Sequence, residues 1–276
     1  MKTTMPKTPA VRVRGKTFRL SAVAPDAAAP FAHHISSKEA AETRLEILRE
    51  RLSELQELLY AEHRRSLLLV FQAMDTGGKD GAIKNLLTGI NPAGVQVTSF
   101  KAPSAEEQSH DFLWRVHART PRRGHIGVFN RSHYEDVLIT RVHGFVDEAT
   151  CQQRYQNINH FEALLTGSGT RILKFFLHIS KQKQAERLQA RLDDPAKNWK
   201  FDPNDIQERA HWNDYQHAYQ DALRHCSPPD APWFVVPADH KWARDLAITE
   251  IVVATLEGMN PRPPKATYDV AAQVVE

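Results

Sequence analysis

The segment SLLLVFQAMDTGGKDG (residues 66–81) decides how this 276-residue chain is expected to fold. It begins with an uninterrupted apolar run at 66–71, which is typical of a strand buried on both faces of a parallel sheet. Gly77 and Gly78 then allow a tight turn, and a helix is expected to begin near Lys79. A strand, a glycine-rich turn and a helix in this order predict a phosphate-binding P-loop.

The usual P-loop (Walker A) sequence is G-x-x-x-x-G-K-[ST], and this chain keeps its spacing with two departures. Ala73 takes the first glycine position, and Asp80 replaces the hydroxyl residue. Backbone N–H groups of such a turn converge on phosphate oxygens, and the helix dipole adds to the attraction. The phosphate-binding residues expected here are Gly77, Gly78, Lys79, Asp80, Gly81 and Lys84. The alternative interpretation is a plain glycine-rich turn that Asp80 caps.

Two charged residues of this loop are expected to take part in catalysis. Lys79 would supply positive charge to the phosphoryl group that is transferred. The carboxylate of Asp75 is unusual in a nucleotide-binding loop, because it repels phosphate unless a metal ion lies between them. Asp75 is therefore the leading candidate for a Mg²⁺ ligand.

Strand-like and helical segments alternate along the rest of the chain. Strands are also expected at 95–100, 126–129, 171–178 and 233–236, and helices at 38–63, 79–90, 105–120, 150–165, 181–192, 203–224 and 242–257. This alternation predicts an α/β fold, a doubly wound parallel sheet of about five strands flanked by helices. Ligands bind such sheets beyond the carboxyl ends of the strands.

The same segments indicate three parts of the chain. Residues 1–37 mix basic residues, proline and alanine, and are expected to form an irregular arm. Residues 38–258 are expected to form one domain, and the proline-rich residues 259–276 a tail. Within the domain, residues 181–203 are expected to form a helical lid that excludes water from the reacting phosphate.

The composition narrows the possible classes of protein. A formal net charge of +3 leaves room for a basic groove but does not identify a nucleic-acid binder. The two cysteines, Cys151 and Cys226, are far apart and predict neither a zinc site nor a disulfide. No apolar run approaches the roughly 20 residues of a membrane span, and the basic N-terminus lacks an apolar signal core. We expect a cytoplasmic protein that binds neither nucleic acid nor membrane.

A second polar cluster, NRSHYED (residues 130–136), directly follows the apolar run at 126–129. Polar residues just past a buried strand lie where a parallel sheet places its active site. Arg131 can hold phosphate with two parallel hydrogen bonds, as lysine cannot. Arg141 could reach the same pocket if a helix lies between the two arginines.

The other residues of this cluster have more ordinary interpretations. Glu135 could bind metal or assist the acceptor, and a purely structural role is almost equally consistent with its position. His133 is expected to be an ordinary polar loop residue. Asp136 is expected to be a carboxylate in the first turn of a helix.

Positive charge gathers in the expected lid. Arg187 and Arg191 share one helix face with Lys183, and Lys197 and Lys200 continue the charge along the chain. Such a run is often only a solvated face. Here it follows a strand, and we expect it to bind a polyanion rather than a single nucleotide.

Five motifs follow one another along the chain: AMDTGGKDG at 73–81, FKAPS at 100–104, HDFLWRVH at 110–117, FNRSHYEDVLITRVHG at 129–144 and DDPAKNWKF at 193–201. Together they resemble the motifs of polyphosphate kinases of type 2. The resemblance runs from about residue 45 to the last expected strand. It implies a P-loop kinase fold akin to thymidylate kinase and Mg²⁺-dependent transfer of phosphate between inorganic polyphosphate and nucleotides, with Mn²⁺ as a substitute.

The resemblance also implies roles for individual residues. It implies that Asp75 and Lys79 serve metal and phosphate, and that Asn130 and Arg131 form the counterpart of the Walker-B-like motif at the nucleotide. Many members carry aspartate where this chain has Asn130, and the variant is similar to class III, whose members accept nucleoside mono- and diphosphates. A direct metal role at position 130 is then in doubt, which shifts attention to Asp75, with Glu135 as a second candidate.

The function expected from the sequence is transfer of the terminal phosphoryl group of polyphosphate to AMP and ADP, which would regenerate ATP. Positioning and charge neutralisation would suffice, because the acceptor oxygen is already ionised. One alternative is a nucleotide-dependent P-loop kinase for a small phosphorylated acceptor. Another is a nucleic-acid binder, although aromatic residues do not alternate with the lid cations. A homo-oligomer is also expected.

Overall fold

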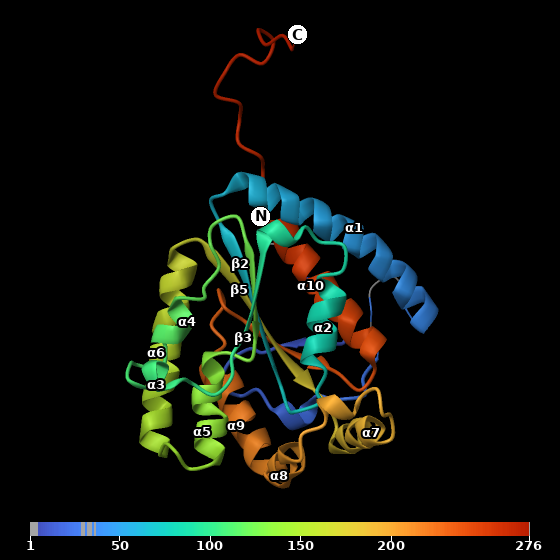
Figure 1. The fold of residues 1–276 in the computed structure, drawn as a ribbon, viewed down its shortest axis with the longest axis vertical. Helices are drawn as coiled ribbons and strands as arrows, with labels where there is room; N and C mark the ends of the chain where they lie inside the picture. Colours follow the sequence, from blue (N-terminus) through green and yellow to red (C-terminus); the bar gives the residue numbers. More distant parts are fainter. Residues whose placement is uncertain (1–4, 29–30, 32–34, 36, 276) are drawn as a thin grey trace.

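A mostly parallel sheet forms the centre of the fold (Figure 1). The structure is a computed structural model that describes residues 5–28, 31, 35 and 37–275. Within these residues the sheet has six strands in the order β1-β6-β5-β2-β4-β3. The strands are β1 (Val11–Arg12), β2 (Ser66–Ala73), β3 (Val95–Ser99), β4 (Ile126–Asn130), β5 (Thr170–His178) and β6 (Trp233–Pro237). Strand β1 is antiparallel to β6, and the other neighbours are parallel.

The central strand β2 explains the position of the glycine-rich loop. All eight of its residues are buried, as expected for a strand with helices on both faces. Its neighbours are β4 and β5, with Phe71 beside Asn130 and Ala73 beside Leu177. Because these strands are parallel, the loop after Ala73 and the turn after Asn130 emerge at the same edge of the sheet.

Two layers of helices cover the sheet (Figure 1). The helices are α1 (Lys38–Glu62), α2 (Lys79–Leu86), α3 (Ala105–Gln108), α4 (Trp114–His117), α5 (Ile139–Val142), α6 (Glu148–Gly167), α7 (Lys181–Leu192), α8 (Asn204–Ala210), α9 (Trp212–His225) and α10 (Lys241–Met259), and short 3-10 helices include η1 (Leu20–Ala22), η4 (His133–Val137) and η5 (Asn198–Lys200). Helices α1, α2 and α10 pack on one face, and α4, α5, α6 and α9 on the other. Helix α7, which lies in the segment expected to form a lid and is called the lid helix below, is near the carboxyl ends of the strands.

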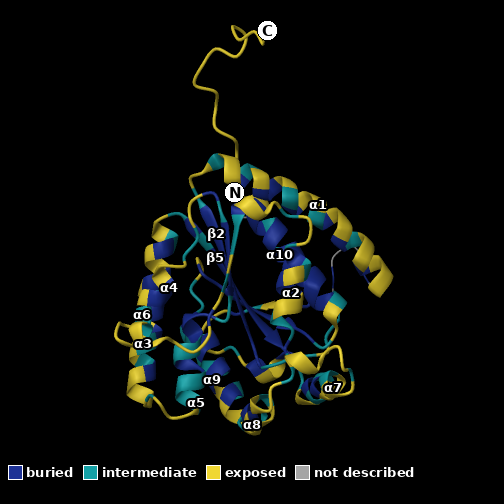
Figure 2. Cartoon of the chain, viewed as in Figure 1, coloured by how far each residue is buried: buried dark blue, intermediate teal, exposed yellow. Residues whose placement is uncertain are grey.

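Each face of the sheet has its own hydrophobic core (Figure 2). On one face, α1 buries Leu45, Leu48, Leu52, Leu55 and Leu59, and its other side is charged and exposed. The helical spacing of these leucines is the pattern that predicted the helix. Helix α10 is apolar on most sides because α1, α2 and the sheet all contact it.

The predicted α/β class with a parallel sheet is confirmed, but the number of strands was too low. The additional strand β1 lies in the segment for which we expected no regular structure. The sequence could not predict β1, because two residues are too few for a periodic pattern. The strand forms by pairing with the edge of β6. The arm also packs at Phe18, whose carbonyl accepts hydrogen bonds from Gln220 and Arg224. Part of the arm (1–4, 29–30, 32–34 and 36) lies outside the described residues.

Two predicted helices are each divided in the structure. The segment 105–120 forms the short helices α3 and α4, since the side chain of Asp111 accepts a hydrogen bond from the backbone N–H of Leu113 between them. The segment 203–224 breaks at His211, which leaves helical geometry between α8 and α9. Beyond α10, Asn260 adopts a left-handed conformation, and an exposed extended segment follows. Within the described residues, no helix is both long and apolar enough to cross a membrane.

Candidate active site

The loop between β2 and α2 has the shape that a phosphate group needs. Thr76 and Gly78 adopt positive φ angles of 58° and 97°, and the N–H of Gly77 donates to the carbonyl of Met74 at 2.9 Å. A Cβ at Gly77 would lie 2.6 Å from the Cβ of Ala73, so only glycine fits there. Alternating left-handed residues turn successive N–H groups toward one point, which forms an anion-binding concavity.

Lys79 folds back over this loop. Its Nζ donates a hydrogen bond to the carbonyl of Ala73 at 3.1 Å, so the ammonium is held above the turn rather than extended into solvent. Burial lowers the pKa of Lys79, and the Asp75 carboxylate acts in the opposite direction. A partly desolvated ammonium interacts more strongly with an anion than a solvated one does. The side chain is therefore placed where phosphate oxygens would replace the Ala73 carbonyl as its partner.

The turn after β4 is tied to the loop by side chains. Nη2 of Arg131 donates a hydrogen bond to Oδ1 of Asp75 at 2.9 Å, and Nδ2 of Asn130 donates one to Oδ1 of Asp80 at 2.6 Å. Arg131 itself has a φ of 61°, an uncommon conformation for a residue with a side chain. The two polar clusters of the sequence thus meet at one edge of the sheet, as the parallel topology requires.

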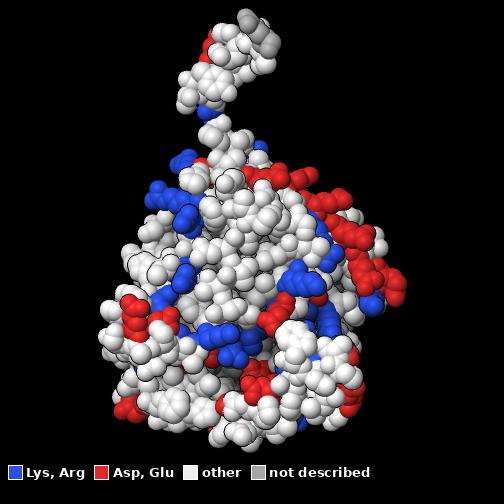
Figure 3. Space-filling view, viewed as in Figure 1, with Lys and Arg blue, Asp and Glu red and all other residues white. Residues whose placement is uncertain are grey.

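Glu135 faces the same edge from helix η4. Its Oε1 accepts a hydrogen bond from the amide of Gln72, a fully buried residue of β2, at 3.1 Å. The Gln72 contact fixes the carboxylate close to Lys79 and Arg131, which both feel its charge. Figure 3 shows acidic and basic side chains side by side in a hollow of this face, near the ends of α5 and α7.

The lid helix α7 lies directly against the loop. Nε2 of Gln184 donates to the carbonyl of Asp75 at 2.9 Å. The guanidinium of Arg187 donates to the carbonyls of Thr76 at 3.1 Å and Ala238 at 2.6 Å, so it joins the loop to the end of β6. Because carbonyl groups carry no formal charge, the positive charge of Arg187 remains available to an anion.

Other cations of the segment expected to form the lid already have partners, in the same segment or in α8 directly after it. Arg191 forms an ion pair with Asp205 at 3.1 Å, and Lys197 forms one with Asp194 at 2.6 Å. The Nζ of Lys200 lies 4.9 Å from the ring of Trp199. Arg191 and Lys197 would have to exchange these carboxylates for phosphate in order to contact a polyanion.

Two predicted site residues lie farther from the loop. Lys84 is exposed in the last turn of α2. Arg141 forms ion pairs of 2.8 Å with Asp221 and with Glu148. Within the described residues, the hydrogen bonds and ion pairs of Arg141 go to α6 and α9 and not to Arg131.

The sequence reasoning missed Arg244 of α10. Its side chain is 2% exposed and pairs with Asp245 at 2.6 Å, while its Nη1 lies so close to Gly78 that an added Cβ would overlap it. Arg187 approaches the same glycine from the lid side. Two guanidinium groups therefore flank the turn that precedes Lys79. The available signal was a charged Arg-Asp pair near the start of a mostly apolar helix.

His133 also differs from its prediction. We expected an ordinary polar loop residue, but its side chain is fully buried and contacts Glu162 of α6 at 3.3 Å. Burial lowers the pKa of His133, so the imidazole is neutral near pH 7. The local sequence gave no sign of this burial, because the partner lies 29 residues farther along the chain.

The carboxylates at the site fit a divalent cation that phosphate helps to hold. The described residues contain no group of three or more histidine, cysteine or acidic side chains arranged for a metal ion. Mg²⁺ commonly binds one or two carboxylates together with water and substrate phosphates, rather than a complete protein cage. The side chain of Asp75 is 28% exposed and lies in the loop. Burial and, as the second cause, the nearby charge of Asp75 raise the pKa of Asp205 to about 6, so the two carboxylates are close to each other.

We expect Asp136→Asn to change the pH dependence of stability. Burial raises the pKa of Asp136 to about 6 from 3.8, against the effect of Arg154, so the folded protein binds this proton more tightly than the unfolded chain. Wild-type stability is therefore lost through this group as the pH rises from about 4 to about 6. Asparagine cannot ionise, and the stability of the variant relative to the wild type should therefore be about 2 kcal/mol greater at pH 7 than at pH 4.

Urea unfolding of both proteins between pH 4 and pH 8 measures this difference. Arg154 retains its hydrogen bond to the Asp136 carbonyl at 2.6 Å in the variant, so the change is confined to the carboxyl group. Parallel stability curves for the two proteins would contradict the expectation.

Comparison with known proteins agrees with this geometry. Residues 35–264 match the family model "Polyphosphate kinase 2 (PPK2)". An AMP/ADP-polyphosphate phosphotransferase of Meiothermus ruber is 47% identical over 93% of this chain and 96% of its own length. An ADP-polyphosphate phosphotransferase of Rhodopseudomonas palustris is 49% identical over 79% of this chain and 80% of its own.

A solved structure shows the same fold. The crystal structure of polyphosphate kinase 2 from Arthrobacter aurescens TC1 superimposes with a TM-score of 0.92 at 45% identity, over 98% of this chain and 96% of that one. The residues that match the family model include the glycine-rich loop, the turn after β4 and helix α7. This chain therefore belongs to the polyphosphate kinase 2 family.

Proposed function

We propose that the chain transfers the terminal phosphoryl group of inorganic polyphosphate to AMP and to ADP, which yields ADP and ATP. The observation that carries this proposal is the convergence of Lys79, Asp75 and Arg131 at the carboxyl ends of β2 and β4. Family membership and the names of the relatives support the same donor and acceptors. The reaction is reversible in principle.

The chemistry needs little from the protein beyond positioning and charge. A terminal phosphate oxygen of the nucleotide attacks the end phosphorus of the chain, a new P–O bond forms, and the bond to the shortened polyphosphate breaks. The attacking oxygen is already ionised near pH 7, so no strong general base is required. Lys79 and Arg131 would neutralise charge on the transferred group, and Arg187 and Arg244 would stabilise the donor beside the loop.

A divalent cation, Mg²⁺ with Mn²⁺ as a substitute, is part of the proposal. Bound at Asp75 with phosphate oxygens, it would neutralise charge on the donor and orient it. Glu135 is the second candidate ligand, held by Gln72. The Asp75 carboxylate also holds Arg131, so the same side chain links metal binding to the orientation of the guanidinium.

Asn130, Arg131 and Arg141 are proposed to bind the acceptor nucleotide. Asn130 and Arg131 stand at the strand end beside the loop. Arg141 would have to release Asp221 or Glu148 before it could contact the acceptor. Homo-oligomeric assembly and a cytoplasmic location remain predictions, and light scattering after size-exclusion chromatography tests the first.

Comparison of phosphate donors tests the proposed function. With AMP as the fixed acceptor, polyphosphates of graded length should be better donors than ATP, and the rate should rise with chain length because the lid and loop offer several cations. Product analysis with AMP should show ADP first and then ATP. A nucleotide-dependent kinase predicts the reverse, with ATP as the best donor and no gain from longer chains.

A further inference from the structure

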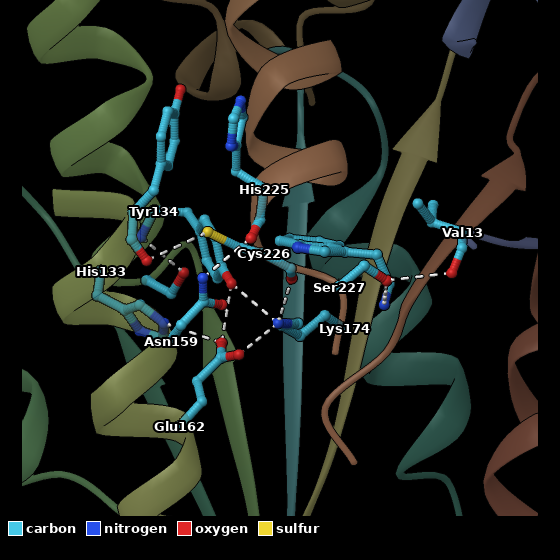
Figure 4. A network of polar contacts seen from close by, with 12 residues as sticks. Val13, His133, Tyr134, Asn159, Glu162, Lys174, His225, Cys226 and Ser227 are labelled. Carbon is cyan, nitrogen blue, oxygen red and sulfur yellow. Dashed lines mark hydrogen bonds and ion pairs between the residues drawn. The ribbon is translucent and has the colours of Figure 1, made fainter. Parts of the chain in front are cut away.

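A fully buried polar network lies beneath the turn after β4 (Figure 4). Its centre is the ion pair between Lys174 of β5 and Glu162 of α6, with Nζ 2.5 Å from Oε2. The hydroxyl of Tyr134 accepts from Lys174 and donates to Glu162, both at 2.9 Å, and His133 contacts Glu162 at 3.3 Å. The carbonyl of Cys226 accepts the remaining lysine bond at 2.7 Å. All four side chains of the network are at most 1% exposed.

Such a network contributes little to the free energy of unfolding. Removing two charges from water costs several kcal/mol each, and apolar residues of similar volume often stabilise a core as well or better. What this buried network does provide is a fixed arrangement, because each polar atom has few alternative partners, although Nδ1 of His133 has no hydrogen-bond partner among the described residues. Its position in the molecule should therefore indicate what is being fixed.

The network holds the stretch of chain between Arg131 and Glu135, two residues of the candidate site. Arg131 and Glu135 face the loop, while His133 and Tyr134, which lie between them in sequence, point into the network. The N–H of Tyr134 also donates to Oγ of Ser132 at 3.2 Å. The inner side of the turn is thus held by α6 and β5, and the charged side chains of Arg131 and Glu135, one on each side of the held residues, face the loop.

The turn needs such support because its backbone is not relaxed. Arg131 has a φ of 61°, and residues with side chains hold this conformation only where surrounding structure determines it. The backbone N–H of Arg131 donates to the carbonyl of Phe71 at 3.1 Å, but no strand pairing continues beyond this bond. The anchored side chains of His133 and Tyr134 are the next fixed points.

We propose that Glu162 and Lys174 act through Tyr134 and His133 as positioning residues that hold Arg131 and Glu135 at the reacting phosphate. This inference rests on the proposed function, since it assigns the network to that same site. Loosening the anchor displaces the guanidinium while leaving every group that touches substrate in the chain. Misplacement of a catalytic group by about 1 Å can cost on the order of 10²-fold in rate.

The variant Tyr134→Phe tests the proposal. It removes one hydroxyl and keeps the ring, and Lys174 retains its bonds to Glu162 and Cys226, so the core stays filled and the ion pair stays intact. We expect kcat for transfer from polyphosphate to AMP to fall about tenfold, with KM for both substrates nearly unchanged. The matched control is Ser66→Ala, which removes a buried hydroxyl bonded to Thr170 at the opposite ends of the strands.

Stability measurements separate positioning from a general loss of structure. Thermal midpoints of both variants are determined, and kcat is measured well below them. His133→Phe is a second variant, which removes the bond to Glu162 and keeps a ring against Tyr134 and Phe161. It should lower kcat less than Tyr134→Phe, and the double variant more than either one.

Equal kcat values for Tyr134→Phe and Ser66→Ala would overturn the proposal, and so would a rise in KM with unchanged kcat. Arg131→Ala, assayed in parallel, distinguishes failure of the positioning role from failure of the proposed active site. If Arg131→Ala is nearly inactive while Tyr134→Phe matches the control, the positioning role fails and the proposed site stands. If Arg131→Ala is nearly as active as the wild type, the proposed site itself is wrong.

Discussion

Replacing Lys79 by alanine is expected to lower the rate of phosphoryl transfer by about 10²–10³-fold, which corresponds to about 3–4 kcal/mol of lost transition-state stabilisation. The ammonium lies over the turn in contact with the carbonyl of Ala73, where phosphate oxygens would take its place. Alanine removes the ammonium that lies over the turn. Arg131, Arg187 and Arg244 approach from other elements and cannot move into the vacated position without losing their own contacts.

The measurement is ATP formation from polyphosphate and ADP at saturating concentrations of both. Lys38→Ala is a suitable control, because it removes an exposed lysine at the start of α1, whose nearest ion pair is with Glu42. Thermal unfolding of both variants shows whether the loss of activity reflects the loss of fold. Near-normal ATP formation by Lys79→Ala would rule out the assignment of the loop as the phosphate site.

The position of the loop could be predicted because its determinants are contiguous. An apolar strand, two glycines and a helix start lie within residues 66–81, and each acts over a few residues. The approach of Arg131 to Asp75 followed from topology, since parallel strands place their carboxyl ends together. Local pattern and one rule of sheet architecture were therefore sufficient to predict that the glycine-rich loop and the turn after β4 lie together.

Contacts between distant elements could not be predicted in this way. The partners of Arg187 are backbone carbonyls, which every residue carries and no sequence pattern distinguishes. Arg244 reaches Gly78 from a helix more than 160 residues later in the chain. The burial of His133 depends on Glu162 and its lysine partner, in an adjacent helix and strand.

A weaker signal was present for the buried network. Lys174 interrupts the apolar run of β5, and a charged residue inside a strand buried on both faces requires a partner of opposite charge. The sequence alone does not identify that partner, because several acidic residues precede the strand. Only the packing of α6 on β5 selects Glu162.

The lid illustrates a different limit of sequence reasoning. Its cations were expected to face a polyanion, but Lys197 pairs with Asp194 of the same segment and Arg191 pairs with Asp205 of α8. The exposed Lys197–Asp194 pair contributes about 0–1 kcal/mol to stability, so a polyanion could replace Asp194 at small cost, whereas Arg191 and Asp205 are partly buried. We interpret the pairs as temporary partners of cations that the donor would recruit, whereas Arg187 already stands at the loop.

Asp75→Asn is expected to lower activity on the order of 10²-fold at a fixed, low concentration of Mg²⁺, and to shift the half-maximal Mg²⁺ concentration upward by about 10–100-fold. The substitution removes the charge that attracts the cation. The amide oxygen of asparagine can still accept the hydrogen bond that Arg131 now donates to Oδ1. The substitution therefore tests the role of Asp75 in metal binding while it leaves the hydrogen bond that orients Arg131.

Activity is titrated with Mg²⁺ and with Mn²⁺ for the wild type, Asp75→Asn and the exposed control Asp214→Asn, whose carboxylate lies at the start of α9. If Asp75 serves only to hold Arg131, asparagine preserves that role, and the metal dependence of the variant should coincide with that of the wild type. Partial recovery at high Mg²⁺ is the outcome expected of a ligand. Because phosphate oxygens supply the other ligands, recovery should also improve at higher polyphosphate concentration, and a titration that is independent of polyphosphate would contradict a shared site.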